Sequence, residues 1–365
     1  MTISHTDIWK LSIPMHPFKI ATGTMTFAQN LFIRVHTSDD LYGCGECSAF
    51  PVITGETQNT CFEMAKDFAA LWKGKNALDI GNRLADLANF TAFNGTVKSA
   101  FDMALHDLAA KAQNQPLYAF LGGEKRVMET DLTIGLDDAA NMAAKAAEFV
   151  KSGVRIIKVK LGTDAPSDIL RVKLIRENTS ADIRIRIDAN QGWSYDKALL
   201  VLNEISKYNV EFCEQPMRTW NDHLLSALRK NNPIAIMADE SVFDHHDAKM
   251  IIENDGCDSI NIKFSKSGGI AEADRIYNVC VENNIPCMMG GMLESRMALT
   301  AFAHYASARP NIRYYDMDTC MLGHKLDPVQ GGVHYNGYHV ELPDGPGIGA
   351  DIDDNFLKNC EHVVV

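Results

Sequence analysis

Positive charge is scarce in this chain of 365 residues, which has 35 Lys and Arg against 47 Asp and Glu and a formal net charge of −12. Nucleic acids and anionic membranes attract proteins through clustered basic residues, so we expect neither as a partner. Long hydrophobic runs are absent as well. The first residues, MTISHTDIWKLSI, also lack the basic start and apolar centre of a secretory signal.

The cysteines lack the pattern of a disulfide framework. Their number, nine, is odd and their spacing is irregular, so we expect reduced thiols in a cytoplasmic protein. Cys44 and Cys47 form a single C-x-x-C in the stretch LYGCGECSAF, with no second ligand pair nearby. Because a structural zinc site needs four ligands, we expect this pair to hold no metal.

Low-complexity segments and Pro- or Gly-rich linkers are missing too, so the domain division must be inferred from a change in pattern. The length predicts about two domains. Residues 1–125 resemble an α+β domain, in which DIWKLSI, LFIRVHT and LYGCGEC are expected to form an antiparallel sheet. Helical periodicity follows in three stretches, at 58–73, 78–89 and 95–114. Residues 326–365 contain one more expected strand, HYNGYHVEL, which should return to the N-terminal domain.

Residues 126–325 alternate between strands and helices. Eight strands are expected in DLTIG, IIKVK, IRIRID, VEFCE, IAIMAD, SINIK, PCMMG and IRYYD. Eight such units predict an α/β fold of the (β/α)8 barrel type, with the eighth helix shortened or irregular. The alternative is an open doubly wound sheet, but such a sheet would need a Gly-rich phosphate loop after its first strand, and the sequence has none.

Chemically active side chains end four consecutive strands of this region. Asp188, Glu214, Asp239 and Lys263 are separated by 26, 25 and 24 residues, about one strand plus one helix each time. In a parallel barrel the carboxyl ends of the strands meet on one face, where such enzymes hold their active sites. Three carboxylates that meet there need a cation between them, and oxygen ligands favour Mg²⁺.

Two lysines of the second strand complete the expected site. Lys158 and Lys160 point to the same face because they are two residues apart. The second and sixth strands of an eight-stranded barrel lie opposite each other, so Lys160 should face Lys263 across the pocket. Two opposed bases beside a metal suit removal of a proton next to a carboxylate and its return on the other face. This is the chemistry of a racemase or epimerase.

Six motifs resemble those of the enolase superfamily, in its muconate-lactonizing subgroup: KVK, DANQGW, EQP, ADES, NIKFSKSGG and GGMLESR. The resemblance covers nearly the whole chain. It implies an N-terminal capping domain over a modified barrel, with Mg²⁺ held by Asp188, Glu214 and Asp239 and acid/base chemistry by Lys160 and Lys263. The subgroup includes cycloisomerases, o-succinylbenzoate synthases, N-acylamino acid racemases and dipeptide epimerases, so the reaction stays open at this point.

The eighth strand favours one of these reactions. Asp316 and Asp318 in YYDMDT should point the same way at the barrel mouth, where they could hold a free ammonium group. An Asp-x-Asp here is similar to that of dipeptide epimerases, whose substrate contacts also include a threonine that Thr133 resembles. Lys158 is expected among the substrate-binding residues. The alternative is an acid pair that only caps the next helix.

The expected substrate is a small dipeptide with a neutral side chain. In epimerases for Ala-Glu an arginine of the capping loop pairs with the glutamate, whereas the aligned position in PFKIATGTMTF is Gly23. Lys19 is the only cation nearby. We therefore expect Ala-X dipeptides such as Ala-Ala, with Ala-Glu second, and a homo-oligomeric enzyme. A barrel that has lost its activity and only binds a partner is the remaining alternative, and the intact set of acids and lysines speaks against it.

Overall fold

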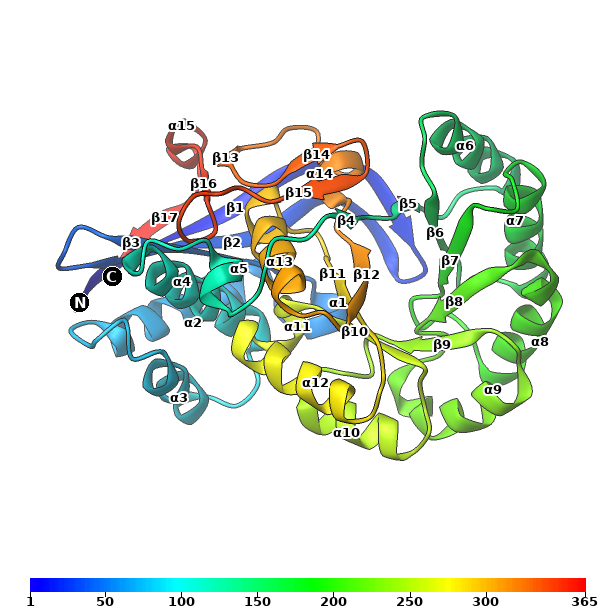
Figure 1. The fold of residues 1–365 in the computed structure, drawn as a ribbon, viewed down its shortest axis with the longest axis horizontal. Coiled ribbons are helices and arrows are strands. Elements are labelled where there is room, and N and C mark those ends of the chain that lie inside the picture. The colour runs from blue at the N-terminus through cyan, green and yellow to red at the C-terminus, as the bar shows by residue number, and fades with distance from the viewer.

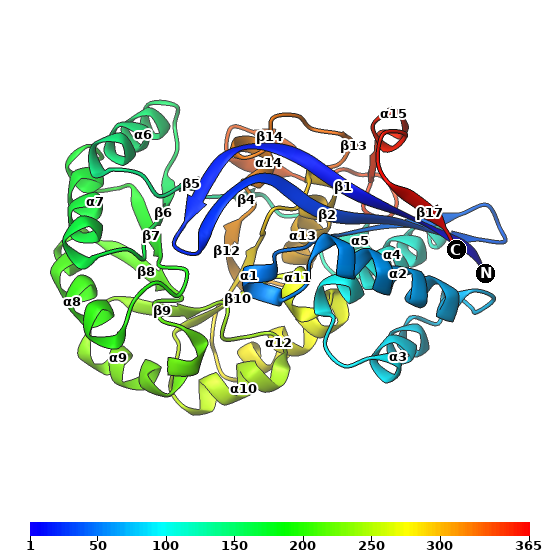
Figure 2. The ribbon, with the colours of Figure 1, turned by 180° about the vertical axis from the view of Figure 1, so that it is seen from behind.

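A computed structural model describes residues 1–365 and shows an antiparallel sheet with its helices beside a ring of parallel strands (Figure 1). The antiparallel sheet has the order β17-β1-β2-β3. Its first two strands, β1 (Ile3–Ile20) and β2 (Gly23–Thr37), form a hairpin far longer than an average strand pair. The edges are β3 (Tyr42–Ser48) and β17 (His362–Val364). Figure 2 shows the hairpin reaching from this sheet to the barrel.

The predicted helices of the first 125 residues are confirmed within two residues at their ends. The helices of this part are α1 (Pro51–Thr54), α2 (Gln58–Trp72), α3 (Ile80–Phe90), α4 (Gly95–Ala112) and α5 (Leu117–Phe120). One stripe of α2 is buried, as expected for a helix that packs one face on a sheet. In contrast, α4 is buried on nearly all sides because it lies between β3 and the barrel helix α11 (Phe264–Ser267).

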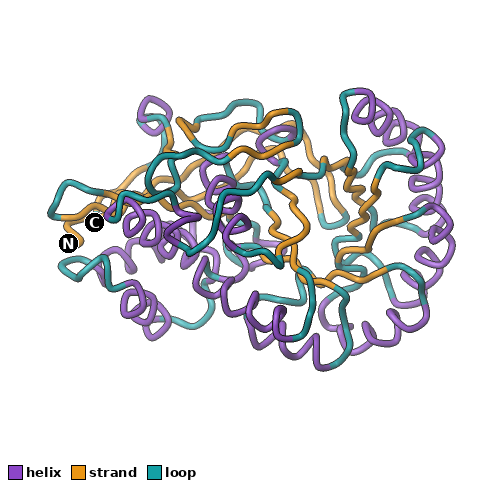
Figure 3. The backbone as a smooth tube through the Cα atoms, viewed as in Figure 1, coloured by secondary structure: helices purple, strands orange, loops and turns teal.

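Eight parallel strands form the predicted barrel, in the order β12-β11-β10-β9-β8-β7-β6-β5, with helices outside (Figure 3). The strands are β5 (Leu132–Ile134), β6 (Ile156–Lys160), β7 (Arg184–Asp188), β8 (Val210–Glu214), β9 (Ala235–Ala238), β10 (Ser259–Ile262), β11 (Cys287–Gly290) and β12 (Ile312–Asp316). The register pairs Lys160 with Asp188 and Asp188 with Glu214, so the carboxyl ends of these strands are level. The ring closes where Asp131 N donates to Tyr315 O (3.2 Å).

The barrel helices begin at side-chain caps in several places. Asp138, Asp164, Ser194, Asp244 and Ser295 accept backbone N–H groups of the first turns of α6, α7, α8, α10 and α13. The elements are α6 (Ala139–Lys151), α7 (Ala165–Glu177), α8 (Tyr195–Ile205), η1 (Ser206–Tyr208), η2 (Thr219–Leu224), α9 (Leu225–Asn231), α10 (His245–Glu253), α11 (Phe264–Ser267), α12 (Ile270–Glu282), α13 (Arg296–Ala308) and α14 (Thr319–Leu322). The eighth helix, α14, has only four residues, which confirms the expected shortening.

The expectation for HYNGYHVEL is wrong. This segment forms two strands, β14 (His334–Asn336) and β15 (His339–Glu341), and β15 pairs with β4 (Met128–Glu129), which precedes the amino end of the first barrel strand. The turn between them is Gly337-Tyr338, and a two-residue loop that begins with Gly favours a hairpin, which the single-strand interpretation overlooked. The chain returns to the N-terminal sheet only with β17, which pairs with β1.

The remaining elements of the tail are β13 (Val329–Gly331), β16 (Ala350–Ile352) and α15 (Asp354–Leu357). The domain boundaries at residues 125 and 325 stay predictions. All nine cysteines are unpaired, as expected. None of the helices has the length and apolar character needed to span a lipid bilayer.

Candidate active site

Three carboxylates stand side by side at the ends of adjacent strands. Asp188 and Glu214 end β7 and β8, Asp239 directly follows β9, and all three side chains are fully buried. Asn190 N donates to Asp188 Oδ1 (2.7 Å), and Asn261 Nδ2 donates to Glu214 Oε1 (2.8 Å). A buried carboxylate needs hydrogen-bond donors to remain charged, and these donors stabilise the ionised forms of Asp188 and Glu214.

The predicted lysines approach these acids from two sides. Lys160 Nζ donates to Asp188 Oδ2 (2.6 Å), and Lys263 Nζ donates to Asp239 Oδ2 (2.8 Å). Their strands, β6 and β10, are four positions apart in the sheet order, which is half of an eight-stranded ring. The two lysines therefore enter from opposite walls of the barrel.

The electrostatics of this cluster are those of a cation site. Burial and the charge of Asp188 raise the pKa of Glu214 to about 7, and burial and the charge of Asp239 raise the pKa of Glu240 to about 8. Neither side-chain oxygen of Glu240 has a hydrogen-bond donor, although the residue is buried. In contrast, the charges of neighbouring lysines outweigh burial and lower the pKa values of Asp188 and Asp239, so these two carboxylates stay ionised. Adjacent carboxylate oxygens are hard donors that suit a small divalent cation, and Asp188, Glu214 and Asp239 fit Mg²⁺ by donor type.

A second acidic group lies across the pocket, at the eighth strand. Carboxylate oxygens of Asp131, Asp316 and Asp318 lie within 4.8 Å of one another. Asp318 Oδ2 accepts the backbone N–H of Thr133 (2.6 Å), and Asp316 Oδ2 accepts from Lys158 Nζ (2.7 Å). Burial and the charge of Asp316 raise the pKa of Asp318 to about 7, and burial and that same charge raise the pKa of Asp131 well above its usual value. Asp131 Oδ2 also accepts from Arg186 Nη1 (2.9 Å), so Asp318 is the carboxylate of this group without a cation within 4.0 Å, and it could accept an ammonium group.

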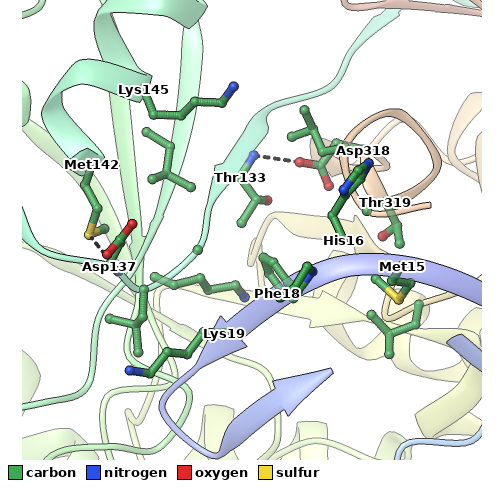
Figure 4. A pocket seen from close by; sticks show the side chains of 18 of the residues that line it. Met15, His16, Phe18, Lys19, Thr133, Asp137, Met142, Lys145, Asp318 and Thr319 are labelled. Atoms are coloured by element: carbon green, nitrogen blue, oxygen red, sulfur yellow. Dashed lines mark hydrogen bonds between the residues drawn. The ribbon is translucent and has the colours of Figure 1, made fainter. Parts of the chain in front are cut away.

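A pocket of about 590 Å³ lies between the β1–β2 hairpin and the barrel mouth. Thr133, Lys160, Asp316 and Asp318 line it, so the structure brings together one predicted base and the predicted ammonium clamp. Figure 4 shows Thr133 and Asp318 joined by their hydrogen bond, with Phe18 of the hairpin near them, whereas the side chain of Lys19 extends away from this pair. Much of the lining is apolar, from Met15, Phe18, Ile134, Leu136, Met142, Phe149, Met292, Leu293 and Leu322.

The other predicted residues lie behind the pocket lining. Lys158 is 1% exposed, and its Nζ also lies 2.6 Å from Glu214 Oε2 and 3.4 Å from Asp188 Oδ2. The carboxylates overcome the effect of burial and raise its pKa, so Lys158 is a fixed positive charge between the two acidic groups. Gly23 does not line the pocket, whereas Lys19 does.

Several residues of the site were not predicted. Lys266 Nζ lies 2.5 Å from Asp239 Oδ1, and Asn190 and Asn261 donate to the acids. These residues and Glu240 stand in or beside motifs that the sequence displays, DANQGW, ADES and NIKFSKSGG, and polarity at a strand end was the available signal. Asp131, before the first barrel strand, had no such motif.

Comparisons with known proteins agree with this geometry. A family model described as mandelate racemase / muconate lactonizing enzyme, N-terminal domain, matches residues 4–122, and one described as enolase C-terminal domain-like matches 141–356. The D-Ala-D/L-Ala epimerase of Cytophaga hutchinsonii is 39% identical over the full length of both chains. A dipeptide epimerase from the same organism, solved with Mg and D-Ala-L-Val, superimposes with a TM-score of 0.98 at 39% identity and full coverage of both chains.

Two further relatives are similar over most of their length. The hydrophobic dipeptide epimerase of Enterococcus faecalis is 37% identical over 91% of this chain and 94% of its own. The L-Ala-D/L-Glu epimerase of Bacillus subtilis, in a substrate-liganded complex, has a TM-score of 0.93 at 31% identity, covering 96% of this chain and 99% of its own.

Proposed function

The chain belongs to the mandelate racemase and muconate lactonizing enzyme family of the enolase superfamily, and from this we propose that it is an Mg²⁺-dependent dipeptide epimerase. Its relatives are epimerases and racemases, and the chain is an enzyme of the same isomerase class. The observation that carries the proposal is one pocket with an acid/base lysine, Lys160, and a pair of carboxylates, Asp316 and Asp318, in its lining. A dipeptide zwitterion matches these two poles, with its carboxylate toward the lysines and its ammonium at the acid pair.

The two lysines would perform the proton transfer at the α-carbon of the C-terminal residue. Lys160 Nζ would take the proton from one face, and Lys263 Nζ would deliver one to the opposite face, with the roles exchanged for the other epimer. The charges of Asp239 and Glu214 outweigh burial and raise the pKa of Lys263, which suits a proton donor. Asp188, Glu214 and Asp239 would hold Mg²⁺, which when bound stabilises negative charge developing on the substrate carboxylate.

The preferred substrates would be dipeptides with Ala first and a neutral residue second, such as Ala-Ala. The largely apolar lining supports this preference, because a carboxylate side chain would lose its hydration there. The 39% identical relative is a D-Ala-D/L-Ala epimerase, so D-Ala as well as L-Ala should be tested as the first residue. A cytoplasmic location and a homo-oligomeric state stay predictions.

The test is incubation of the full chain with Mg²⁺ and a dipeptide library in D₂O. The library contains D-Ala and L-Ala series with neutral, acidic and basic second residues, and matched N-acetyl and N-succinyl amino acids. We expect deuterium only at the α-carbon of the second residue of Ala-X dipeptides. Inert dipeptides beside exchanged N-acyl amino acids would favour an N-acylamino acid racemase instead.

Removal of the metal is the companion measurement. Exhaustive chelation should abolish exchange, and Mg²⁺ should restore it. Asp188→Asn, Glu214→Gln and Asp239→Asn should each reduce kcat/KM by orders of magnitude, because the proposed Mg²⁺ site loses a ligand. Full turnover after chelation would refute the metal requirement.

A further inference from the structure

A cluster of three histidines and one aspartate lies on the antiparallel sheet, far from the barrel residues described above. His5 and Asp7 belong to β1, His36 to β2 and His362 to β17. Residues two apart on a strand point to one face, and the register sets His36 directly opposite His5. Three adjacent strands, including the first and last of the chain, thus bring four metal-ligating groups together.

The distances fit a shared ion. His36 Nε2 lies 2.9 Å from Asp7 Oδ2, and His5 Nε2 lies 3.7 Å from the same oxygen. Ligands about 2.0 Å from a tetrahedral zinc ion are roughly 3.3 Å apart. The ligand atoms of His5, Asp7 and His36 all lie within 4.8 Å of one another. The His5 and His36 rings are stacked, with centroids 4.3 Å apart and an interplanar angle of 6°, so the two rings are close enough to share an ion once one of them turns out of the parallel stack.

The nitrogens of the cluster are poised for coordination. His36 Nε2 is buried and makes no well-aligned hydrogen bond. Ser4 Oγ lies 3.0 Å from His5 Nδ1, which leaves His5 Nε2 free to face Asp7. Metal-bound histidines commonly use the second ring nitrogen in this way, to fix tautomer and orientation. His362 Nε2 lies 2.6 Å from Asp7 Oδ1, so the carboxylate links the third histidine to the group.

We propose that His5, Asp7 and His36, supported by His362, form a binding site for a first-row transition metal ion such as Zn²⁺, distinct from the Mg²⁺ site of the barrel. Imidazole ligands favour such ions over Mg²⁺, which prefers oxygen donors. The site joins the C-terminal strand to the first strand. Val365 N donates to Thr6 O and Thr6 N to Val365 O, both at 3.0 Å, directly beside the cluster. Zinc would therefore restrain the end of the chain.

The test measures zinc binding to the full chain, made without a polyhistidine tag. Binding is measured at saturating Mg²⁺ by equilibrium dialysis and metal analysis. The variants are His5→Gln and His36→Gln, with His246→Gln as the matched control, since His245 and His246 form another close histidine pair, with ring centroids 3.9 Å apart and ring planes tilted by 37°. Zinc bound at the barrel carboxylates is identified as the zinc that is lost in Asp239→Asn. We expect one zinc ion per chain in addition to that. Affinity should fall at least about tenfold in each cluster variant and stay unchanged in the control.

A second readout keeps the proposal testable if one variant folds poorly. Zn²⁺ should slow amide hydrogen exchange of Val365 and Thr6 in the wild type and in His246→Gln, but not in His5→Gln, whose side chain is 40% exposed and tolerates replacement. Equal zinc stoichiometry and affinity in the wild type and both cluster variants would overturn the proposal. Absence of zinc binding by the wild type would equally overturn it and identify the cluster as a hydrogen-bonded network only.

Discussion

At the residue scale, Asp316 and Asp318 are two positions apart yet have different partners. Asp316 contacts Lys158, whereas Asp318 accepts only the backbone N–H of Thr133. Replacement of Asp318 by Asn should therefore lower kcat/KM for dipeptides at least about tenfold, since a charge-assisted hydrogen bond contributes about 1.5–3 kcal/mol. N-acetylation of the substrate should cost the wild type a similar factor but cost the variant little. Equal wild-type rates on free and acetylated dipeptides would refute the clamp.

The same carboxyl predicts a pH dependence. Burial and the charge of Asp316 raise the pKa of Asp318 to about 7, so Asp318 gains a proton and loses its charge as the pH falls below that value. Binding of an ammonium group should weaken in step, and kcat/KM for dipeptides should fall from pH 8 to pH 6 through a rise in KM. Asp318→Asn should remove this dependence of KM on pH. Parallel pH profiles of KM for the two proteins would contradict the assignment.

The two lysines should be stereochemically distinct, since they come from opposite walls, β6 and β10. Lys160→Ala and Lys263→Ala should both abolish epimerisation. Each variant should retain, at most, exchange of one substrate epimer with D₂O, because the remaining base reaches one face of the α-carbon. Proton NMR of both epimers measures this directly. A variant that still interconverts the epimers at the wild-type rate would exclude the two-base mechanism.

At the element scale, β3 and α4 pack so closely that only glycine fits between them. A Cβ on Gly45 would lie 1.8 Å from Ala100 O, and one on Gly43 would lie 2.0 Å from Ala104 O. Gly45→Ala should lower the free energy of unfolding by about 3 kcal/mol or more, because the clash is with backbone. Gly81→Ala in α3 is the matched control, with open space around it and an expected gain of about 0.5–1 kcal/mol. Urea unfolding compares the two, and equal stability would contradict the close packing.

The sequence predicted most elements because their patterns are local. Periods of two and 3.6 residues and the spacing of strands specify the eight barrel strands and the helices α2, α3 and α4 without knowledge of the fold. The hairpin of β14 and β15 had a local signal, the glycine of its turn, which the single-strand interpretation overlooked, whereas its pairing with β4 had none. Which edge a short strand joins depends on distant partners such as β4, and no feature within the segment encodes that choice.

At the scale of the whole molecule, the site could be predicted where residues share a strand end and not where it depends on contacts across the fold. Asp188, Glu214 and Asp239 follow from spacing alone. The burial of Lys158 between two acidic groups, and the pairing of Asp131 with the eighth strand, depend on how the ring closes. The spacing of residues along the sequence does not show which side chains meet where the first and eighth strands join.

The pocket is lined by residues of the N-terminal hairpin and of the barrel, and we expect these two parts to have different roles. The hairpin supplies Phe18 and Lys19, whereas the barrel supplies Lys160 and the acid pair, so the hairpin should select substrates without affecting proton transfer. Lys19 makes no ion pair within 4.0 Å, unlike Lys145, whose Nζ lies 2.9 Å from Glu148 Oε2. Lys19→Ala should therefore leave kcat/KM for Ala-Ala within about threefold while reducing any activity on Ala-Glu about tenfold, the loss of one charge pair.

Lys145→Ala is the matched control, because it removes a second pocket cation that is already paired. Steady-state kinetics on both dipeptides, for the wild type and the two variants, complete the comparison. The wild type should prefer neutral dipeptides, since Lys19 is the only cation of the hairpin in the lining and Lys145 is already paired, so the side-chain carboxylate of Ala-Glu regains little of its lost hydration. A wild-type kcat/KM for Ala-Glu tenfold above every neutral dipeptide would reverse this assignment. If Lys19→Ala then removed that advantage, Lys19 would be the specificity residue of an Ala-Glu epimerase.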